Sequence, residues 1–150
     1  MSTTITTATF SATITEAITL NGQTKNTEVV QTWTDIIYDE VRTRSAGTSV
    51  SNLATFGAAA AAGNFVDTKL RYFRITNYDD TNFITVGISV SAGDTSYHKV
   101  KAGDSFVYCT DVIDANTAGG AFVAFTQIDA ITVMADTAAC DIEYRIVAAI

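Results

Sequence analysis

The chain has 150 residues, enough for one domain with a substantial hydrophobic core that needs no disulfide. Its 16 acidic residues outnumber its 9 basic residues, and the formal net charge of −7 repels nucleic acid phosphates and anionic membranes, so we expect neither as a direct partner. No run approaches the roughly 18 apolar residues of a membrane span, and the opening MSTTITTATF has no signal-peptide pattern, so folding in the cytoplasm is expected.

The residue usage indicates a protein built mainly of β-strands. Threonine is the commonest residue, and together with Val, Ile, Phe and Tyr it favours pleated, half-buried strands. Residues 1–8 are rich in threonine and contain Ile5, and we interpret them as a flexible arm that adds a strand to a neighbouring sheet. The rest, residues 9–150, is expected to form a single β-sandwich domain.

The first predicted strand alternates Phe10, Ala12 and Ile14 with polar residues, as expected of a strand with one wet face. Asn21-Gly22 then predicts a turn. Residues 27–45 follow as one or two further strands, although their apolar spacing also fits a helix.

Residues 52–69 depart from strand chemistry, because five consecutive alanines lie between Gly57 and Gly63. A packed loop is the main interpretation. A surface where another subunit approaches closely and a short helix are the alternatives, the helix being disfavoured by the two glycines.

The segment from Leu70 to Val90 predicts a β-hairpin. Phe73 and Ile75 share one face of its first strand, Tyr72 and Arg74 the other, and the apolar alternation resumes after the polar NYDDTN. The Asn and Asp side chains of this turn are explained by hydrogen bonds to their own backbone, with Ca²⁺ binding as the weaker alternative.

Further strands and glycine turns follow as far as the C-terminal CDIEYRIVAAI, whose apolar end we expect to be tied into a sheet. Turns about every ten residues are typical of antiparallel folds of six to nine strands. The predicted fold class is therefore all-β, an antiparallel β-sandwich or a jelly roll.

Candidate catalytic residues are few. His98 is the single histidine, and its neighbours Asp94, Asp104 and Cys109 form no nucleophile motif. Cys109 and Cys140 have no metal-ligand spacing, and a disulfide between them is the less favoured alternative to two free thiols. We therefore expect no enzyme activity, metal or cofactor.

Residues suited to protein contact are easier to find, because Trp, Tyr and Arg carry much of the binding energy at interfaces. The alternative is that the aromatic residues belong to the core and the arginines to a solvated face. The predicted interface residues are Ile5, Phe10, Trp33, Tyr38, Arg71, Tyr72 and Arg74.

Five stretches from about residue 9 onward resemble small virion structural proteins of tailed bacteriophages: FSATITEAITLNG, LATFG with the small-residue run after it, LRYFRITNYDDTNFITVGIS, KAGDSFVY and ITVMADTAACDIEYRIVAAI. None of these is a functional motif. The resemblance implies a β-sandwich or jelly-roll cement subunit on the outer surface of the capsid, bound to major capsid proteins and to copies of itself as a dimer or trimer.

The same resemblance leaves a tail, baseplate or head-fibre location open. A carbohydrate-binding adhesion module is a further alternative. It would need a platform of exposed aromatic side chains, for which the candidates are Trp33, Tyr72, Tyr78 and Tyr97.

Overall fold

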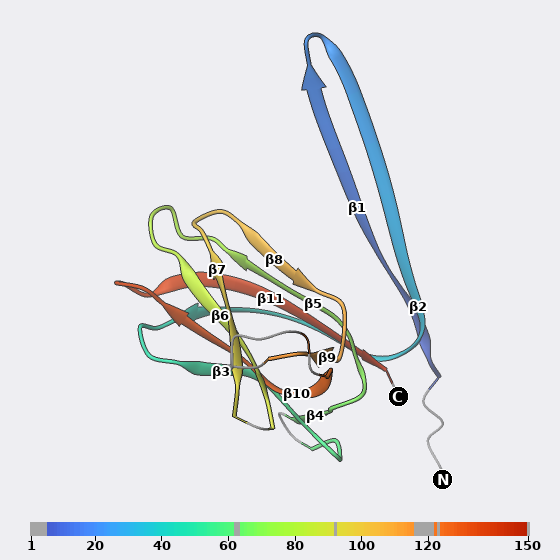
Figure 1. The fold of residues 1–150 in the computed structure, drawn as a ribbon, viewed down its shortest axis with the longest axis vertical. Coiled ribbons are helices and arrows are strands. Elements are labelled where there is room, and N and C mark those ends of the chain that lie inside the picture. Colours follow the sequence, from blue (N-terminus) through green and yellow to red (C-terminus); the bar gives the residue numbers. More distant parts are fainter. Residues whose placement is uncertain (1–5, 62–63, 92, 116–121, 123, 150) are drawn as a thin grey trace.

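The computed structural model describes residues 6–61, 64–91, 93–115, 122 and 124–149, and within them every regular element is a β-strand (Figure 1). The strands are β1 (Ala8–Leu20), β2 (Gln23–Ala46), β3 (Ser51–Gly57), β4 (Asn64–Val66), β5 (Leu70–Asn77), β6 (Ile84–Val90), β7 (Thr95–Val100), β8 (Ser105–Tyr108), β9 (Val112–Ile113), β10 (Thr126–Ala135) and β11 (Cys140–Ala149). No helix among these residues is long and apolar enough to cross a membrane.

Two sheets pack against each other. The first has the strand order β1-β2-β11-β5-β8, and the second has the order β4-β3-β10-β6-β7, with β9 paired to β10. The predicted β-sandwich is confirmed, and its jelly-roll form stays a prediction. The described strands number eleven rather than six to nine, because several short edge strands add to the long ones.

The core lies between the sheets and follows from the alternation of side chains along each strand. Phe73 and Ile75 of β5 are fully buried there, and so are Ile88 of β6 and Ile131 of β10. The apolar face predicted for the C-terminal strand is confirmed, because the buried cluster also includes Ile142, Tyr144 and Ile146. β11 lies between β2 and β5, so the end of the chain is held inside a sheet as expected.

The hairpin predicted from Leu70 to Val90 is wrong. β5 belongs to the first sheet, between β11 and β8, while β6 belongs to the second, between β10 and β7. The polar turn therefore carries the chain from one sheet to the other. The alternation of apolar and polar residues does not distinguish a hairpin from a crossover between sheets. It indicates which side chains are buried and not which strand is the hydrogen-bonded neighbour.

Asn77 anchors this crossover. Its side chain is fully buried and donates to the carbonyl oxygens of Asn82 at 2.9 Å and Val100 at 3.4 Å, while its own oxygen accepts the Asp79 N–H at 3.1 Å. The Asp79 carboxylate accepts from the N–H groups of Thr81 and Asn82. These bonds to the backbone lower the pKa of Asp79 and account for the turn residues as predicted.

The region around the alanine run holds two strands that the sequence did not predict. β3 pairs antiparallel with β10, and β4 pairs parallel with β3. Ala54 and Phe56 of β3 are buried in the core, which explains why residues before the alanines extend as a strand. The helix alternative is wrong for the described residues here, and the loop is held instead by Asn64, whose amide donates to the Ala59 carbonyl at 2.7 Å.

A projecting hairpin as the candidate interaction surface

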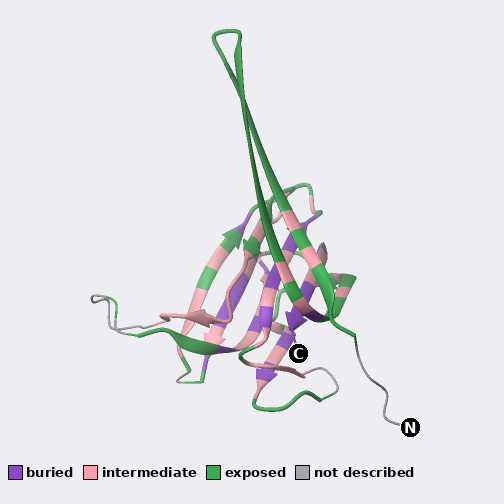
Figure 2. Ribbon diagram, turned by 90° about the vertical axis from the view of Figure 1, so that its right-hand side faces the viewer, coloured by how far each residue is buried: buried purple, intermediate pink, exposed green. Residues whose placement is uncertain are grey.

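β1 and β2 form a long hairpin that leaves the body of the sandwich (Figures 1 and 2). β2 has 24 residues, whereas strands of globular proteins usually have about 5 to 6. Its second half, Ile36–Ala46, pairs with β11, but its first half pairs with β1 alone. The predicted turn is confirmed, with left-handed φ values of 51° at Asn21 and 76° at Gly22, and the helix alternative for residues 27–45 is wrong.

One face of the hairpin, called the apolar face below, carries most of its exposed apolar side chains, interspersed with polar ones such as Glu16 and Lys25. The register pairs Ile14 with Val29 and Ile18 with Lys25, and paired residues of an antiparallel ladder share a face. The exposed fractions are 48% for Ile14, 58% for Ile18, 65% for Leu20 and 48% for Val29. An isolated two-stranded ribbon is marginally stable in water, and apolar side chains at such exposure are typical of a surface that another molecule covers.

The opposite face of the hairpin is rich in hydroxyl groups. Ser11 and Thr32 share a hydrogen bond of 3.1 Å between their side-chain oxygens, and Thr19 and Thr24 share one of 3.0 Å. These cross-strand pairs satisfy one another and face water without cost. Among the described residues of the hairpin, Val30 is the one exposed large apolar side chain on this face, against four on the other, so the apolar face is the better suited of the two to contact.

At the base of the hairpin, three of the predicted interface residues come together. The ring centroid of Phe10 lies 5.8 Å from that of Trp33 and 5.1 Å from that of Tyr72, and Trp33 and Tyr72 are 6.2 Å apart. Arg145 covers Phe10, with its Cζ 4.7 Å from the ring centroid, and binds both carboxylate oxygens of Asp39 at 2.8 and 2.6 Å.

This cluster joins the hairpin to the outer face of the first sheet. Tyr72 is the buried member of the cluster and Val147 is buried against it, and desolvation raises the pKa of Tyr72. The hydrogen bonds that Arg145 donates to Asp39 raise the pKa of Arg145. Phe10, Trp33 and Tyr72 thus pack on one another and hold the hairpin, with Tyr72 buried and Phe10 and Trp33 half-buried, and their role in contacting another molecule stays a prediction.

The predicted arginines each have an acidic partner. Arg71 binds Asp35 at 2.9 Å, and this hydrogen bond is the main reason that the pKa of Asp35 is lowered. Arg74 binds Glu143 on β11 and also contacts the Thr76 hydroxyl. Neither arginine offers an unpaired charge, although both stay partly exposed.

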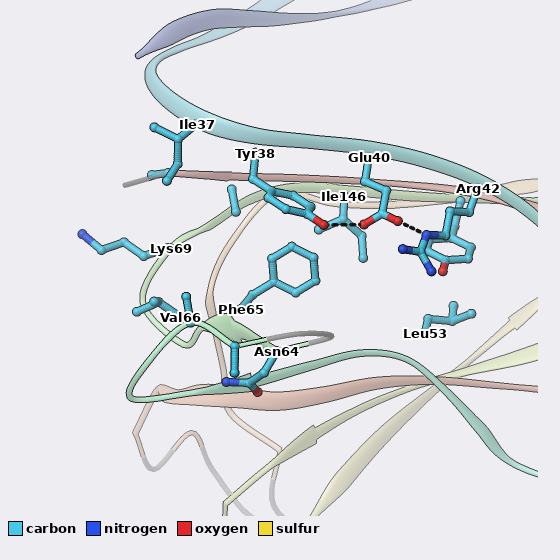
Figure 3. A pocket seen from close by; sticks show the side chains of 15 residues that line it. Ile37, Tyr38, Glu40, Arg42, Leu53, Asn64, Phe65, Val66, Lys69 and Ile146 are labelled. Atoms are coloured by element: carbon cyan, nitrogen blue, oxygen red, sulfur yellow. Dashed lines mark hydrogen bonds and ion pairs between the residues drawn. The ribbon is translucent and has the colours of Figure 1, made fainter. Parts of the chain in front are cut away.

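Tyr38 lies apart from the other predicted residues, in a pocket of about 390 Å³ between β2 and β11 on one side and β3 and β4 on the other (Figure 3). Its hydroxyl donates to Glu40 at 2.7 Å, and Glu40 also pairs with Arg42. The Tyr38 ring meets Phe65 edge-on, with centroids 4.7 Å apart. Glu40 is the one carboxylate among the described lining residues, and it is paired with Tyr38 and Arg42.

The other candidates for chemistry have ordinary partners. His98 stacks on Phe106 with centroids 4.7 Å apart, lies 3.2 Å from the Ser96 hydroxyl, and has its pKa lowered by burial. Both cysteines are free, so the disulfide alternative is wrong, and burial raises the pKa of both thiols. No group of three or more potential metal ligands occurs among the residues that the structure describes.

A scan against protein-family models and a search of curated proteins find no match to this chain. Ile5 lies outside the described residues. The apolar face of the hairpin, including Ile18, Leu20 and Val29, was missed by the sequence reasoning. The signal that could have found it is the apolar spacing of Ile14, Ile18 and Leu20 up to the turn, opposite a run from Gln23 to Glu28 that has no apolar side chain to bury.

Proposed function

We propose that this protein is a structural virion subunit that decorates the capsid of a tailed phage, where it binds major capsid proteins and copies of itself and stabilises the head. The observation that carries the proposal is the hairpin, whose apolar face and strand edges are open in the single chain. The resemblance of the sequence to small virion proteins supports the same class.

A cement role follows physically from many weak contacts made together. Each subunit that engages several lattice neighbours gains from effective concentration, so shallow surfaces are sufficient for stable attachment. The sandwich supplies a rigid body for this purpose, since its central strands are paired on both edges and bury their inward-facing apolar side chains. The acidic net charge keeps the decorated particle soluble and away from nucleic acid.

The adhesion alternative receives less support. A sugar platform requires exposed, coplanar aromatic rings, but Trp33 and Tyr72 are tilted by 57° and packed together with Phe10. Tyr78 and Tyr97 are exposed, at 54% and 69%, but their rings are not paired with another aromatic ring in the described part of the chain.

The test is addition of the purified protein to phage shells that lack it. We expect saturable binding in hundreds of copies per particle and a higher temperature of shell disruption. Binding in about 3 to 12 copies would instead indicate a symmetric tail or baseplate ring. No binding, or binding with no gain in heat resistance, would refute the cement role.

A further inference from the structure

The projecting hairpin has two unpaired edges as well as an apolar face. β1 is the outermost strand of its sheet, so one of its edges is free along its whole length. The first half of β2 is free on the side away from β1, because β11 begins to pair only at Ile36. Exposed edges of this kind template further strand pairing unless something covers them.

The free backbone groups can be assigned from the turn. A two-residue turn places Leu20 and Gln23 in the hydrogen-bonded pair nearest to it, and the ladder then alternates. Thr15, Ala17 and Thr19 therefore direct their N–H and C=O groups away from β2. Their side chains lie on the hydroxyl-rich face, so pairing at this edge leaves the apolar face free to turn inward.

A second copy of the chain matches these edges by symmetry. When copies are related by rotation about an axis parallel to the hairpin, β1 of one copy lies beside β2 of the next. The two strands run in opposite directions, as an antiparallel ladder requires. Such a head-to-tail contact closes into a ring, in which every edge is paired.

The charges on the apolar face are complementary in the same arrangement. Glu16 is paired with Thr27, and Lys25 is two residues further along the same strand as Thr27. Each hairpin therefore places one anion and one cation at nearly the same height along its length on this face. Repetition around an axis alternates Glu16 and Lys25 from successive copies. Both side chains lie on the face that turns inward, so each charge enclosed by the ring meets an opposite charge from the next copy, which is the condition for burying it there.

The area also favours closure on both edges. The hairpin beyond the aromatic cluster comprises about 20 residues. Stable interfaces bury about 800 Å² per partner with 20 to 30 residues, so in proportion a hairpin of this size buries roughly 600 Å² per copy. That reaches the lower end of stable interfaces only if both edges and the apolar face are engaged. Contact on one edge alone would give about half as much.

We infer that three copies of this chain join through their β1–β2 hairpins into a closed six-stranded antiparallel barrel, with the Ile14, Ile18 and Val29 face inward and the threonine face outward. Two hairpins supply four strands, too few to enclose a core, whereas barrels of five strands are known. The inference rests on the proposed function for its setting, and it names how the subunits of a capsid trimer hold together. The three sandwiches then lie at one end of the barrel, where each can contact a lattice neighbour.

The experiment measures the mass of the full chain in solution by sedimentation equilibrium across a wide range of concentration. We expect three times the 15.9 kDa of one chain. A mass of one or two chains would overturn the inference, and a mass of four would overturn the six-stranded barrel in favour of an eight-stranded one.

Matched variants locate the contact. Ile14→Asp places a carboxylate on the apolar face and is expected to weaken trimer formation at least ~100-fold. Thr13→Asp is its control, because Thr13 is the neighbour of Ile14 on the hydroxyl-rich face and is paired with the uncharged Val30, so the trimer should stay intact. Ala17→Pro removes an N–H that points away from β2, so it is expected to abolish the trimer but preserve the hairpin, and Ala17→Ser is its control. Equal effects of Ile14→Asp and Thr13→Asp, or a trimer that survives Ala17→Pro, would contradict the barrel.

Two further measurements separate this inference from the proposed function. A far-ultraviolet spectrum and an unfolding midpoint show whether the variants keep the sandwich, which the exposed position of these residues predicts. Binding to shells is then assayed independently. A monomer that binds shells refutes the barrel alone, and a trimer that ignores shells refutes the capsid role alone.

Discussion

Asn77 offers the most direct test of how the chain passes between the two sheets. Asn77→Ala removes three hydrogen bonds from a fully buried site, two of them at 2.9 and 3.1 Å and one weaker at 3.4 Å. Two good bonds at about 1 kcal/mol each, together with a carbonyl left unsatisfied, give an expected loss of about 2 to 4 kcal/mol in the free energy of unfolding. For a domain of this size the melting temperature falls by about 5 to 15 °C.

The assay is urea unfolding followed by circular dichroism, at one fixed protein concentration because assembly also contributes to stability. Thr137→Ala is the matched control. It removes an exposed hydrogen bond of 2.8 Å to the Asn82 side chain and is expected to cost under about 0.5 kcal/mol. If Asn77→Ala were no more costly than this control, the crossover would not depend on the buried amide.

Two more predictions concern packing and pH. Gly87→Ala is expected to lower the free energy of unfolding in urea by about 1 to 3 kcal/mol, because a Cβ there would lie 2.5 Å from the Thr132 hydroxyl. Adding Thr132→Ala should recover part of this loss, whereas a double variant whose loss equals the sum of the two single losses would contradict the clash. Burial lowers the pKa of His98 from its ordinary 6.5, so the folded protein binds fewer protons at this ring than the unfolded chain, and stability declines as pH falls through 6.5. His98→Gln should flatten that part of the pH profile of the urea midpoint, and an unchanged profile would show that the ring does not contribute to it.

The interface residues show where sequence reasoning succeeds and where it stops. Phe10, Trp33 and Tyr72 are indeed brought together from β1, β2 and β5, but they pack on one another at the base of the hairpin. Residue type predicts that an aromatic side chain will be in contact with something. It does not say whether the contact lies within the chain or beyond it, because burial of a ring has the same benefit in both cases.

The sequence by itself determined the all-β class, the turn at Asn21-Gly22 and the inward face of the last strand, because side-chain alternation and turn chemistry are local properties. Only the tertiary structure decided that the polar turn before Ile84 joins two sheets and that β2 runs past the sandwich to carry an uncovered hairpin. The physical reason is that a strand specifies which of its faces avoids water, while its neighbour in the sheet is selected by backbone hydrogen bonds that every residue can make.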